Sequence, residues 1–284
     1  MISVVIPAYN CASDLRIALA SILAQTWHDW ECIVVDDGSS EPLAQSAELG
    51  DPRISFVRHP RNLGRGAARN TGLAHARGEF IAWQDADDWS YPERLARQQG
   101  FLQTHPDVIA IGTGAAVVDS REQLLGIRCD RTFGPRLLEE LEAPPVVHPT
   151  LMLRRKYLEG ASYPSHLRVS EDLVFMTQAF RGRPFANLGE PLYCYREEQS
   201  QSVAKYWGST RARLWTSWQS APQRPARAAF RMAVAAGKAV LYTAAAGCGA
   251  RGMLYRRRQR LPEDGEHERH REAWRAVRRC EQEA

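Results

Sequence analysis

The sequence predicts an α/β fold, in which a doubly wound, mostly parallel sheet is flanked by helices. Short apolar runs alternate with helical patterns through the first hundred residues, as right-handed strand–helix–strand crossovers require. The first run, residues 2–9 (ISVVIPAY), is apolar at nearly every position, as a strand buried on both faces is. Hydrophobic and charged contents of 44% and 25% are those of a globular protein with a core.

The elements of the first hundred residues follow from local signals. Strands are expected over residues 2–9, 31–37, 54–59 and 79–84. Ser13 is the expected N-cap of a helix that follows it, and Gly78 is expected to end a second helix. Pro92 suits the first position of a third helix, because its missing N–H is not needed there.

Beyond residue 105 the patterns are weaker but continue the alternation. Strands are expected over residues 108–118, 146–155 and 191–197. Ser170 and Gly182 bound a further predicted helix. Residues 199–284 are expected to form a basic, helical C-terminal extension.

The cysteines and the N-terminus bear on the compartment. Six scattered cysteines without a Cys-x-x-Cys pair argue against a zinc ribbon and against a disulfide framework, so a reducing compartment is favoured. The chain enters a strand almost at once, without the basic and apolar regions of a signal peptide. A cytoplasmic location is therefore expected.

Charge is distributed unevenly along the chain. Residues 199–262 contain twelve Lys and Arg and no Asp or Glu, whereas residues 1–198 contain 20 basic and 26 acidic residues. Attraction to this acidic body is one explanation of the basic segment. A peripheral contact with an anionic membrane surface is the other, and interleaved aromatic residues suit it: Trp207, Trp215, Trp218, Phe230 and Tyr242. No nucleic-acid-binding motif accompanies the segment, so no nucleic acid partner is expected.

Three acidic residues, Asp85, Asp87 and Asp88, follow the strand predicted over residues 79–84. Asp85 and Asp87, two apart on an extended segment, point to the same side and could hold one hard cation, Mn²⁺ or Mg²⁺. A solvated loop with helix-capping aspartates is the alternative. The position at a strand end, between Trp83 and Trp89, favours the metal.

Two further segments reach the same edge of the predicted sheet, because ligands of doubly wound sheets lie at the carboxyl ends of the strands. They are residues 7–10 and the pair Asp36 and Asp37, whose carboxylates suit hydrogen bonds from a nucleobase or ribose. Arg65 and Arg69, near the start of the next helix, suit a diphosphate by charge and by helix dipole.

Later residues carry weaker signals. Glu171 and Asp172, in the first turn of a helix, either complement its dipole or include a general base. His148 is more often structural than catalytic when it stands alone. Arg196 is either a surface charge at a strand end or a phosphate ligand.

Four segments resemble, in order and spacing, those of family 2 glycosyltransferases: VVIPAYN, VVDDGSS, NLGRGAARNTGLAHARGEFIAWQDADD and SEDLVFM. Enzymes of that family are inverting and metal-dependent, have the GT-A fold and use nucleotide-diphosphate sugars. The resemblance implies a GT-A catalytic domain over residues 1–198. Its nucleotide-sugar-binding part would be residues 1–105, and its acceptor-binding part residues 106–198.

The resemblance also implies roles for matched residues on the donor side. It places three residues around the nucleoside, namely Pro7, Tyr9 and Asp37. Arg69 would lie near the nucleotide, Asp85 near ribose and metal, and Asp87 on the metal. Arg196 would approach the phosphates.

On the acceptor side, Asp172 matches the family's catalytic base, with Glu171 beside it. His148 and Trp89 are candidates for a contact with the acceptor or the sugar. The chain departs from the family pattern at Gln84, where leucine is usual, and at residues 197–198. There Glu197 and Glu198 stand where such chains often carry a histidine.

The predicted function is transfer of a sugar from a nucleotide-diphosphate sugar, in the first instance a UDP-sugar. The acceptor is expected to be a hydroxyl of a glycan or lipid-linked molecule in surface polysaccharide or glycoconjugate biosynthesis. A sugar-phosphate nucleotidyltransferase is one alternative, but its glycine-rich, lysine-containing loop is missing after the first strand. A binding or scaffold protein with a dead site is the other, and the presence of Asp85, Asp87 and Asp172 argues against it.

Overall fold

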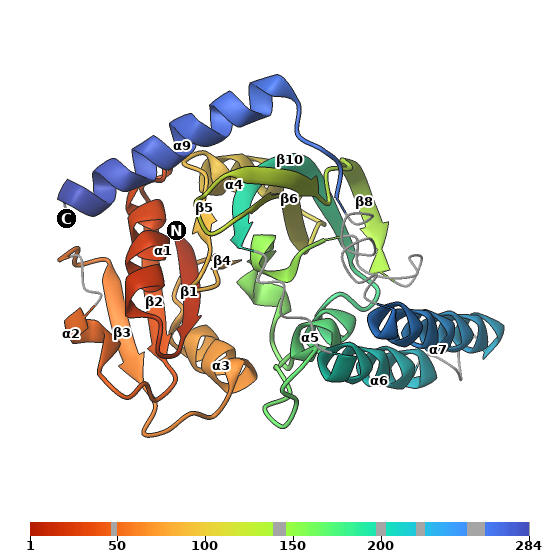
Figure 1. Ribbon diagram of the computed structural model, residues 1–284. Coiled ribbons are helices and arrows are strands. Elements are labelled where there is room, and N and C mark those ends of the chain that lie inside the picture. The colour runs from red at the N-terminus through yellow and green to blue at the C-terminus, as the bar shows by residue number, and fades with distance from the viewer. Residues whose placement is uncertain (47–49, 139–145, 197–202, 220–224, 249–258, 284) are drawn as a thin grey trace.

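The computed structural model describes residues 1–46, 50–138, 146–196, 203–219, 225–248 and 259–283. Glu197 and Glu198 lie outside these residues. Within them, one sheet is flanked by helices (Figure 1), and its longest ladders are parallel. The predicted α/β fold class is confirmed.

Among the described residues, the sheet has ten strands. They are β1 (Ile2–Ala8), β2 (Trp30–Asp36), β3 (Ile54–Arg58), β4 (Phe80–Trp83), β5 (Trp89–Ser90), β6 (Ala110–Val118), β7 (Leu124–Arg128), β8 (Phe133–Leu137), β9 (Met152–Arg154) and β10 (Pro184–Arg196). Their order is β3-β2-β1-β4-β9-β6-β10-β5, with β7 beside β6 and β8 beside β10. Strands β1 to β4 are mutually parallel, as are β6 and β10. Strand β9 runs antiparallel between these two groups.

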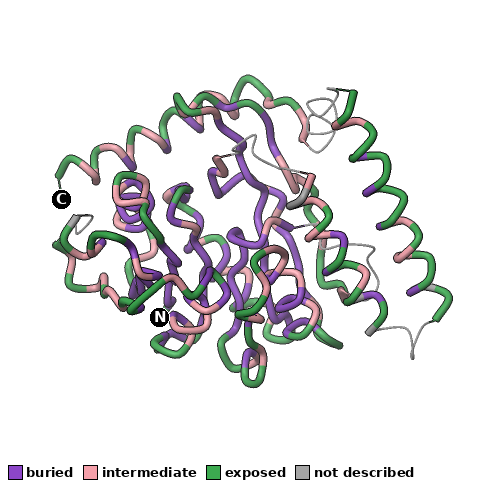
Figure 2. Tube along the Cα trace, turned by 60° about the horizontal axis from the view of Figure 1, so that its bottom comes forward, coloured by how far each residue is buried: buried purple, intermediate pink, exposed green. Residues whose placement is uncertain are grey.

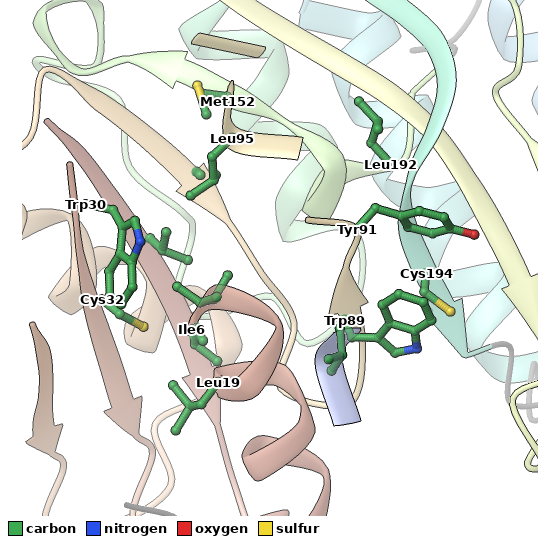
Figure 3. Close-up of a cluster of buried hydrophobic side chains, with 14 of the residues drawn as sticks. Ile6, Leu19, Trp30, Cys32, Trp89, Tyr91, Leu95, Met152, Leu192 and Cys194 are labelled. Carbon is green, nitrogen blue, oxygen red and sulfur yellow. The ribbon is translucent and has the colours of Figure 1, made fainter. Parts of the chain in front are cut away.

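Helices cover both faces of the sheet. They are α1 (Ala12–Leu23), α2 (Leu43–Ser46), α3 (Arg65–His75), α4 (Arg94–Thr104), α5 (Glu171–Ala179), α6 (Val203–Gln219), α7 (Pro225–Gly247) and α9 (Asp264–Glu283), with 3₁₀ turns η2 (His148–Thr150) and η3 (Arg155–Tyr157). Successive β1 residues point to opposite faces, so Val4 and Ile6 pack with α1, α4 and α9, and Val5 packs with α3 and α5. Figure 3 shows part of the first of these two cores, where Leu19 and Trp89 are buried.

The strands expected in the first hundred residues are present, but the expected helix boundaries are wrong in detail. Ser13 lies inside α1, which follows Cys11 without a side-chain cap. Gly78 lies beyond the end of α3. A Cβ at Gly78 would be 2.6 Å from the backbone nitrogen of Ser3, so close packing explains this glycine. Pro92 lies in a turn two residues before α4.

Local geometry also changes the second half of the expected pattern. Residues 146–155 are not one strand, because η2 precedes the short β9. Ser170 precedes α5 in the left-handed conformation, with φ of 60° and no side-chain cap, and Gly182 lies three residues beyond that helix. Strands β5, β7 and β8 were not predicted; β5 has only two residues, and β8 is mostly exposed and contains Gly134 and Pro135, so it carries no apolar run.

The C-terminal helices lie in two places (Figure 1). Helices α6 and α7 form a hairpin beside α5, whereas α9 packs on α1. Ala273 and Val277 of α9 are buried in the first core. Within the described residues, none of the helices has the length and hydropathy needed to cross a membrane. The division of the chain at residue 198 stays a prediction.

Candidate active site at the carboxyl ends of the strands

The loops after β1, β2 and β4 meet at one edge of the sheet. Ala8 pairs with Asp36 where β1 and β2 end, and β4 ends beside β1 at Trp83. The first two loops are also bonded to each other. The backbone N–H of Asn10 donates to Ser39 Oγ at 2.9 Å, and Asn10 Oδ1 accepts from the N–H of Ser40 at 2.9 Å. The sheet therefore brings the predicted donor-side segments together.

The side chains of Asp36 and Asp37 are buried at this edge, where they hold the backbone of the neighbouring loops. Asp36 accepts hydrogen bonds from the N–H groups of Ser39 and Leu43, at 2.8 and 3.2 Å. Asp37 fixes the loop that leads into α3. Its carboxylate lies 2.7 Å from Nδ1 of His59 and accepts hydrogen bonds from the N–H groups of residues 63 and 64. Their predicted contacts with a nucleoside stay predictions.

Pro7 and Tyr9 occupy different environments at the end of β1. Pro7 is the last residue but one of the strand and is buried. Tyr9 follows the strand and is 48% exposed. An exposed aromatic ring at the edge offers a flat apolar surface on which a nucleobase could lie.

A buried arginine joins three parts of the chain at this edge. Arg69 of α3 forms ion pairs with Asp85, which follows β4, and with Glu171 of α5, both at 2.9 Å. Arg65 lies 3.4 Å from the same Glu171. Burial alone would lower the pKa of Arg69, but the carboxylates of Asp85 and Glu171 raise it. Arg69 Nε and Glu171 Oε2 are buried without a hydrogen-bond partner in the described part of the chain.

The other two aspartates after β4 have different surroundings. Burial and the neighbouring Asp85 raise the pKa of Asp87 to about 6. Burial also raises the pKa of Asp88, as do the two other aspartates. Asp88 accepts hydrogen bonds from the hydroxyl of Tyr193 and the N–H of Arg196, both at 2.9 Å. Asp88 therefore holds β10 to this loop, whereas Asp85 is paired through Oδ1 with Arg69 and Asp87 forms no ion pair with a described residue.

Asp172 lies in the first turn of α5, directly after Glu171. Burial raises its pKa, and the charge of Glu171 adds to this effect. Its Oδ1 accepts a hydrogen bond from the N–H of Leu173 at 2.8 Å. A carboxylate with a raised pKa is a stronger base, which suits it for taking a proton from a hydroxyl.

Three other predicted site residues are engaged elsewhere. Arg196 pairs with Asp14 at 2.7 Å and with Glu122 at 2.5 Å. Trp89 is fully buried and donates from Nε1 to Glu122 at 2.9 Å. His148 is buried with Nε2 2.7 Å from the hydroxyl of Tyr163, and burial lowers its pKa well below the usual value. Among the described residues these side chains form no hydrogen bond or ion pair with Asp85 or Asp87, and their predicted ligand contacts stay predictions.

Comparison with known proteins decides the family. A family model described as "Glycosyl transferase family 2" matches residues 3–161. The chain belongs to glycosyl transferase family 2. This confirms the resemblance drawn from the four sequence segments.

Relatives in the family come from distant organisms. EpsE of Bacillus subtilis (strain 168), which carries a provisional glycosyltransferase description, is 34% identical over 215 residues, covering 69% of this chain and 73% of EpsE. The uncharacterized glycosyltransferase MJ1057 of Methanocaldococcus jannaschii is 31% identical over 187 residues. That match covers 62% of this chain and 63% of MJ1057.

Two solved structures share the fold. S. aureus TarS 1-349 in complex with UDP-GlcNAc superposes with a TM-score of 0.65 and 22% identity, over 76% of this chain and 66% of that one. The mannosyltransferase PcManGT of Pyrobaculum calidifontis, in complex with GDP-Man and Mn²⁺, superposes with a TM-score of 0.57 and 19% identity. That match covers 99% of this chain and 86% of the PcManGT chain. At such identities the likeness supports the fold alone, and it is the GT-A fold predicted for the family.

A divalent cation fits the carboxylates of this family 2 chain. Asp85 and Asp87 supply hard oxygen donors, whereas both oxygens of Asp88 already accept hydrogen bonds. No group of three or more His, Cys, Asp or Glu with metal-binding geometry occurs among the residues described. Mg²⁺ and similar ions commonly take one or two protein carboxylates and fill the other positions with phosphates and water. The donor set therefore suits a cation that arrives with a diphosphate.

Two residues important to this edge were missed from the sequence. The Tyr193 hydroxyl accepts from the N–H of Asp85 at 3.0 Å and donates to Asp88, so it fixes both ends of the acidic loop. Arg94 is fully buried and donates to the carbonyls of Trp83 and Pro149. Alternation in β10 could have pointed to Tyr193. An arginine in the apolar stripe of a helix was the available signal for Arg94.

Proposed function

We propose that this family 2 glycosyltransferase transfers a sugar from a nucleotide-diphosphate sugar to an acceptor hydroxyl, with inversion and with Mn²⁺ or Mg²⁺. One observation carries the proposal. The carboxylates of Asp85, Glu171 and Asp172 gather around the buried Arg69, with Asp87 beside Asp85, at the edge of the sheet where β1, β2 and β4 end. Such a set can bind a cationic group on one side and accept a proton on the other.

Donor binding would use the loops of the edge. Asp85 and Asp87 would hold the cation, which neutralises the charge that develops on the departing diphosphate. Arg65, whose side chain is largely exposed, would bind phosphate oxygens. Tyr9 would cover the base. Arg196 would reach the phosphates only after releasing Asp14 or Glu122.

The transfer step would depend on Asp172. Its carboxylate accepts the proton of the acceptor hydroxyl as that oxygen forms a bond to the anomeric carbon. The bond from this carbon to the diphosphate oxygen breaks on the opposite face, and the electron pair leaves with the diphosphate. One displacement inverts the anomeric centre. Glu171 is the less suitable base, because Arg69 pairs with it.

The proposal also specifies the class of donor and the class of acceptor. The TarS structure is a complex with UDP-GlcNAc and the PcManGT structure a complex with GDP-Man, so both support a nucleotide-diphosphate sugar. We favour a UDP-sugar and a glycan or lipid-linked acceptor in surface polysaccharide or glycoconjugate synthesis. A lipid-linked acceptor would place the reaction at the cytoplasmic face of a membrane.

Donor hydrolysis by the full chain tests the proposal. The protein is incubated with a panel of UDP-, GDP- and dTDP-sugars, with Mn²⁺ or with a chelator. Release of nucleoside diphosphate from one donor, only in the presence of the cation, is the expected result. A second incubation contains a sugar phosphate and a nucleoside triphosphate instead. Release of pyrophosphate there would show a nucleotidyltransferase. If the protein bound none of the donors, the alternative of a non-catalytic scaffold protein would be supported.

A further inference from the structure

Helix α7 is apolar on the side that faces solvent as well as on the side that faces the protein. Helix α7 packs on α6, with Tyr242 stacked on Tyr206, and its inner residues are buried: Ala228, Ala235, Ala239 and Tyr242. On its outer side Phe230, Val240 and Leu241 are 56%, 60% and 69% exposed, with exposed alanines between them. Figure 2 shows this long helix at the edge of the molecule, exposed over most of its length. A contiguous apolar patch of this kind on the exposed side of a helix normally has a partner.

Helix α6 extends this exposed apolar surface. Trp207, Arg211, Trp215 and Trp218 are spaced at i, i+4, i+8 and i+11, which places them on one side of the helix. All four are exposed. Nε1 of Trp207 donates to Oγ1 of the exposed Thr243 of α7 at 3.1 Å, so this side adjoins the outer side of α7. We call the joint surface the hairpin face: Trp207, Trp215 and Trp218 with Phe230, Val240 and Leu241.

The charge around the hairpin face selects its partner. Residues 199–262 contain twelve basic and no acidic residues, and the cations Arg211, Arg213 and Lys238 are exposed on the hairpin itself. A second copy would bring this positive charge against itself. Anionic lipid headgroups attract it, and tryptophan side chains favour the level of the headgroups. We propose that the hairpin face lies in the surface of an anionic lipid bilayer, with α6 and α7 parallel to that surface.

The hairpin is joined to the acceptor side of the site. Gly208 of α6 packs against Val169, since a Cβ at Gly208 would lie 3.4 Å from Cβ of Val169. The first turn of α5, with Glu171 and Asp172, begins two residues after Val169. A bilayer under the hairpin would therefore lie on the side of the molecule where the acceptor hydroxyl meets its base. This link rests on the proposed transferase function and favours an acceptor carried on a membrane lipid.

Vesicle co-sedimentation of the full chain tests the hairpin face. Wild type is compared with Leu241→Glu and with a matched control, Leu125→Glu, which adds the same charge at a leucine of β7 that is 47% exposed. We expect wild type and the control to bind phosphatidylglycerol-containing vesicles, and both to bind phosphatidylcholine vesicles more weakly. Leu241→Glu should bind about tenfold more weakly or worse, because a leucine leaves the apolar layer and a like charge enters it.

Two outcomes would overturn the proposal. One is wild-type protein that stays in the supernatant with phosphatidylglycerol vesicles, and the other is equal binding by the two glutamate variants. Sedimentation velocity without lipid tests whether the partner of the hairpin face is a second copy of the chain. A dimer that Leu241→Glu dissociates, together with no vesicle binding, would replace the bilayer by self-association. Hydrolysis of a soluble donor should be the same in wild type and Leu241→Glu, so loss of vesicle binding and failure of the transferase proposal are distinguishable.

Discussion

The buried Arg69 forms an ion pair with the partly buried Asp85, with 2.9 Å between Nη2 and Oδ1. The pair joins the second turn of α3 to the loop after β4. The other terminal nitrogen of Arg69 holds Glu171 at the start of α5. Burial raises the pKa of Asp87 and of Asp172, and the charges of the neighbouring Asp85 and Glu171 add to this effect. The two proposed chemical roles fall on these two residues.

Asp87→Ala is expected to abolish metal-dependent donor binding and to leave the fold intact. The change removes a cation ligand and also relieves repulsion from Asp85 and Asp88, so the free energy of unfolding should stay equal or rise slightly. Calorimetric titration of the preferred sugar nucleotide with Mn²⁺ measures the effect. Asp107→Ala, at an exposed carboxylate away from the edge, is the control. Unchanged Mn²⁺-dependent binding by Asp87→Ala would remove the metal assignment.

Asp172→Asn should lower kcat by about 10²–10⁴ while donor affinity is largely kept, because an amide of the same shape cannot take the proton. Glu171→Gln should act differently. It removes one of the two carboxylates that pair with the buried Arg69, so the free energy of unfolding should fall by about 1–3 kcal/mol, since Asp85 still pairs with the guanidinium. Kinetics and urea unfolding on both variants separate the two roles. Near-normal turnover in Asp172→Asn would show that another residue is the catalytic base, and Glu171 would be the first candidate.

Arg94→Met should destabilise the protein by about 3 kcal/mol or more, because buried carbonyls of Trp83 and Pro149 lose their donor. Burial lowers the pKa of Arg94 to about 10, and no carboxylate contacts its guanidinium among the described residues. Arg94→Lys should therefore rescue little, since one ammonium cannot reach all these acceptors. Urea unfolding gives both values, and a loss below about 1 kcal/mol in Arg94→Met would contradict the structural role.

The packing of α9 should weaken in acid through His270. The carbonyl of Glu122 can only accept, so Nε2 of His270 carries the proton and Nδ1 accepts from the hydroxyl of Tyr91 at 2.7 Å. Burial lowers the pKa of His270 below its usual 6.5. Above about pH 6.5 the ring is neutral in both states, and below it the unfolded chain binds more protons, so stability is lost as pH falls.

The measurement for His270 is the unfolding free energy of wild type and His270→Gln between about pH 8 and pH 5. Other groups titrate equally in both proteins, so the difference between the two isolates the histidine. The stability of wild type relative to the variant should fall as the pH drops below about 6.5. A difference that is independent of pH would show that α9 does not depend on a neutral His270.

Much of this fold was predictable because its first half is periodic. Strands β1 to β4 are apolar runs with helices between them, and parallel topology alone brings the residues after β1, β2 and β4 together. Helix caps were harder, since Cys11 and the left-handed Ser170 make no side-chain cap. The pairing of Arg196 with Glu122 depends on β7 and β10 lying on either side of β6, which no local pattern indicates.

The anomeric configuration of the first product tests the central claim most directly. A donor with an α-linked sugar is hydrolysed by wild type with Mn²⁺ and followed by ¹H NMR before mutarotation. An inverting displacement predicts nucleoside diphosphate together with the β-anomer, and neither from Asp87→Ala or with a chelator. An α-anomer as the first product, or hydrolysis that persists in Asp87→Ala without a cation, would contradict the proposed chemistry.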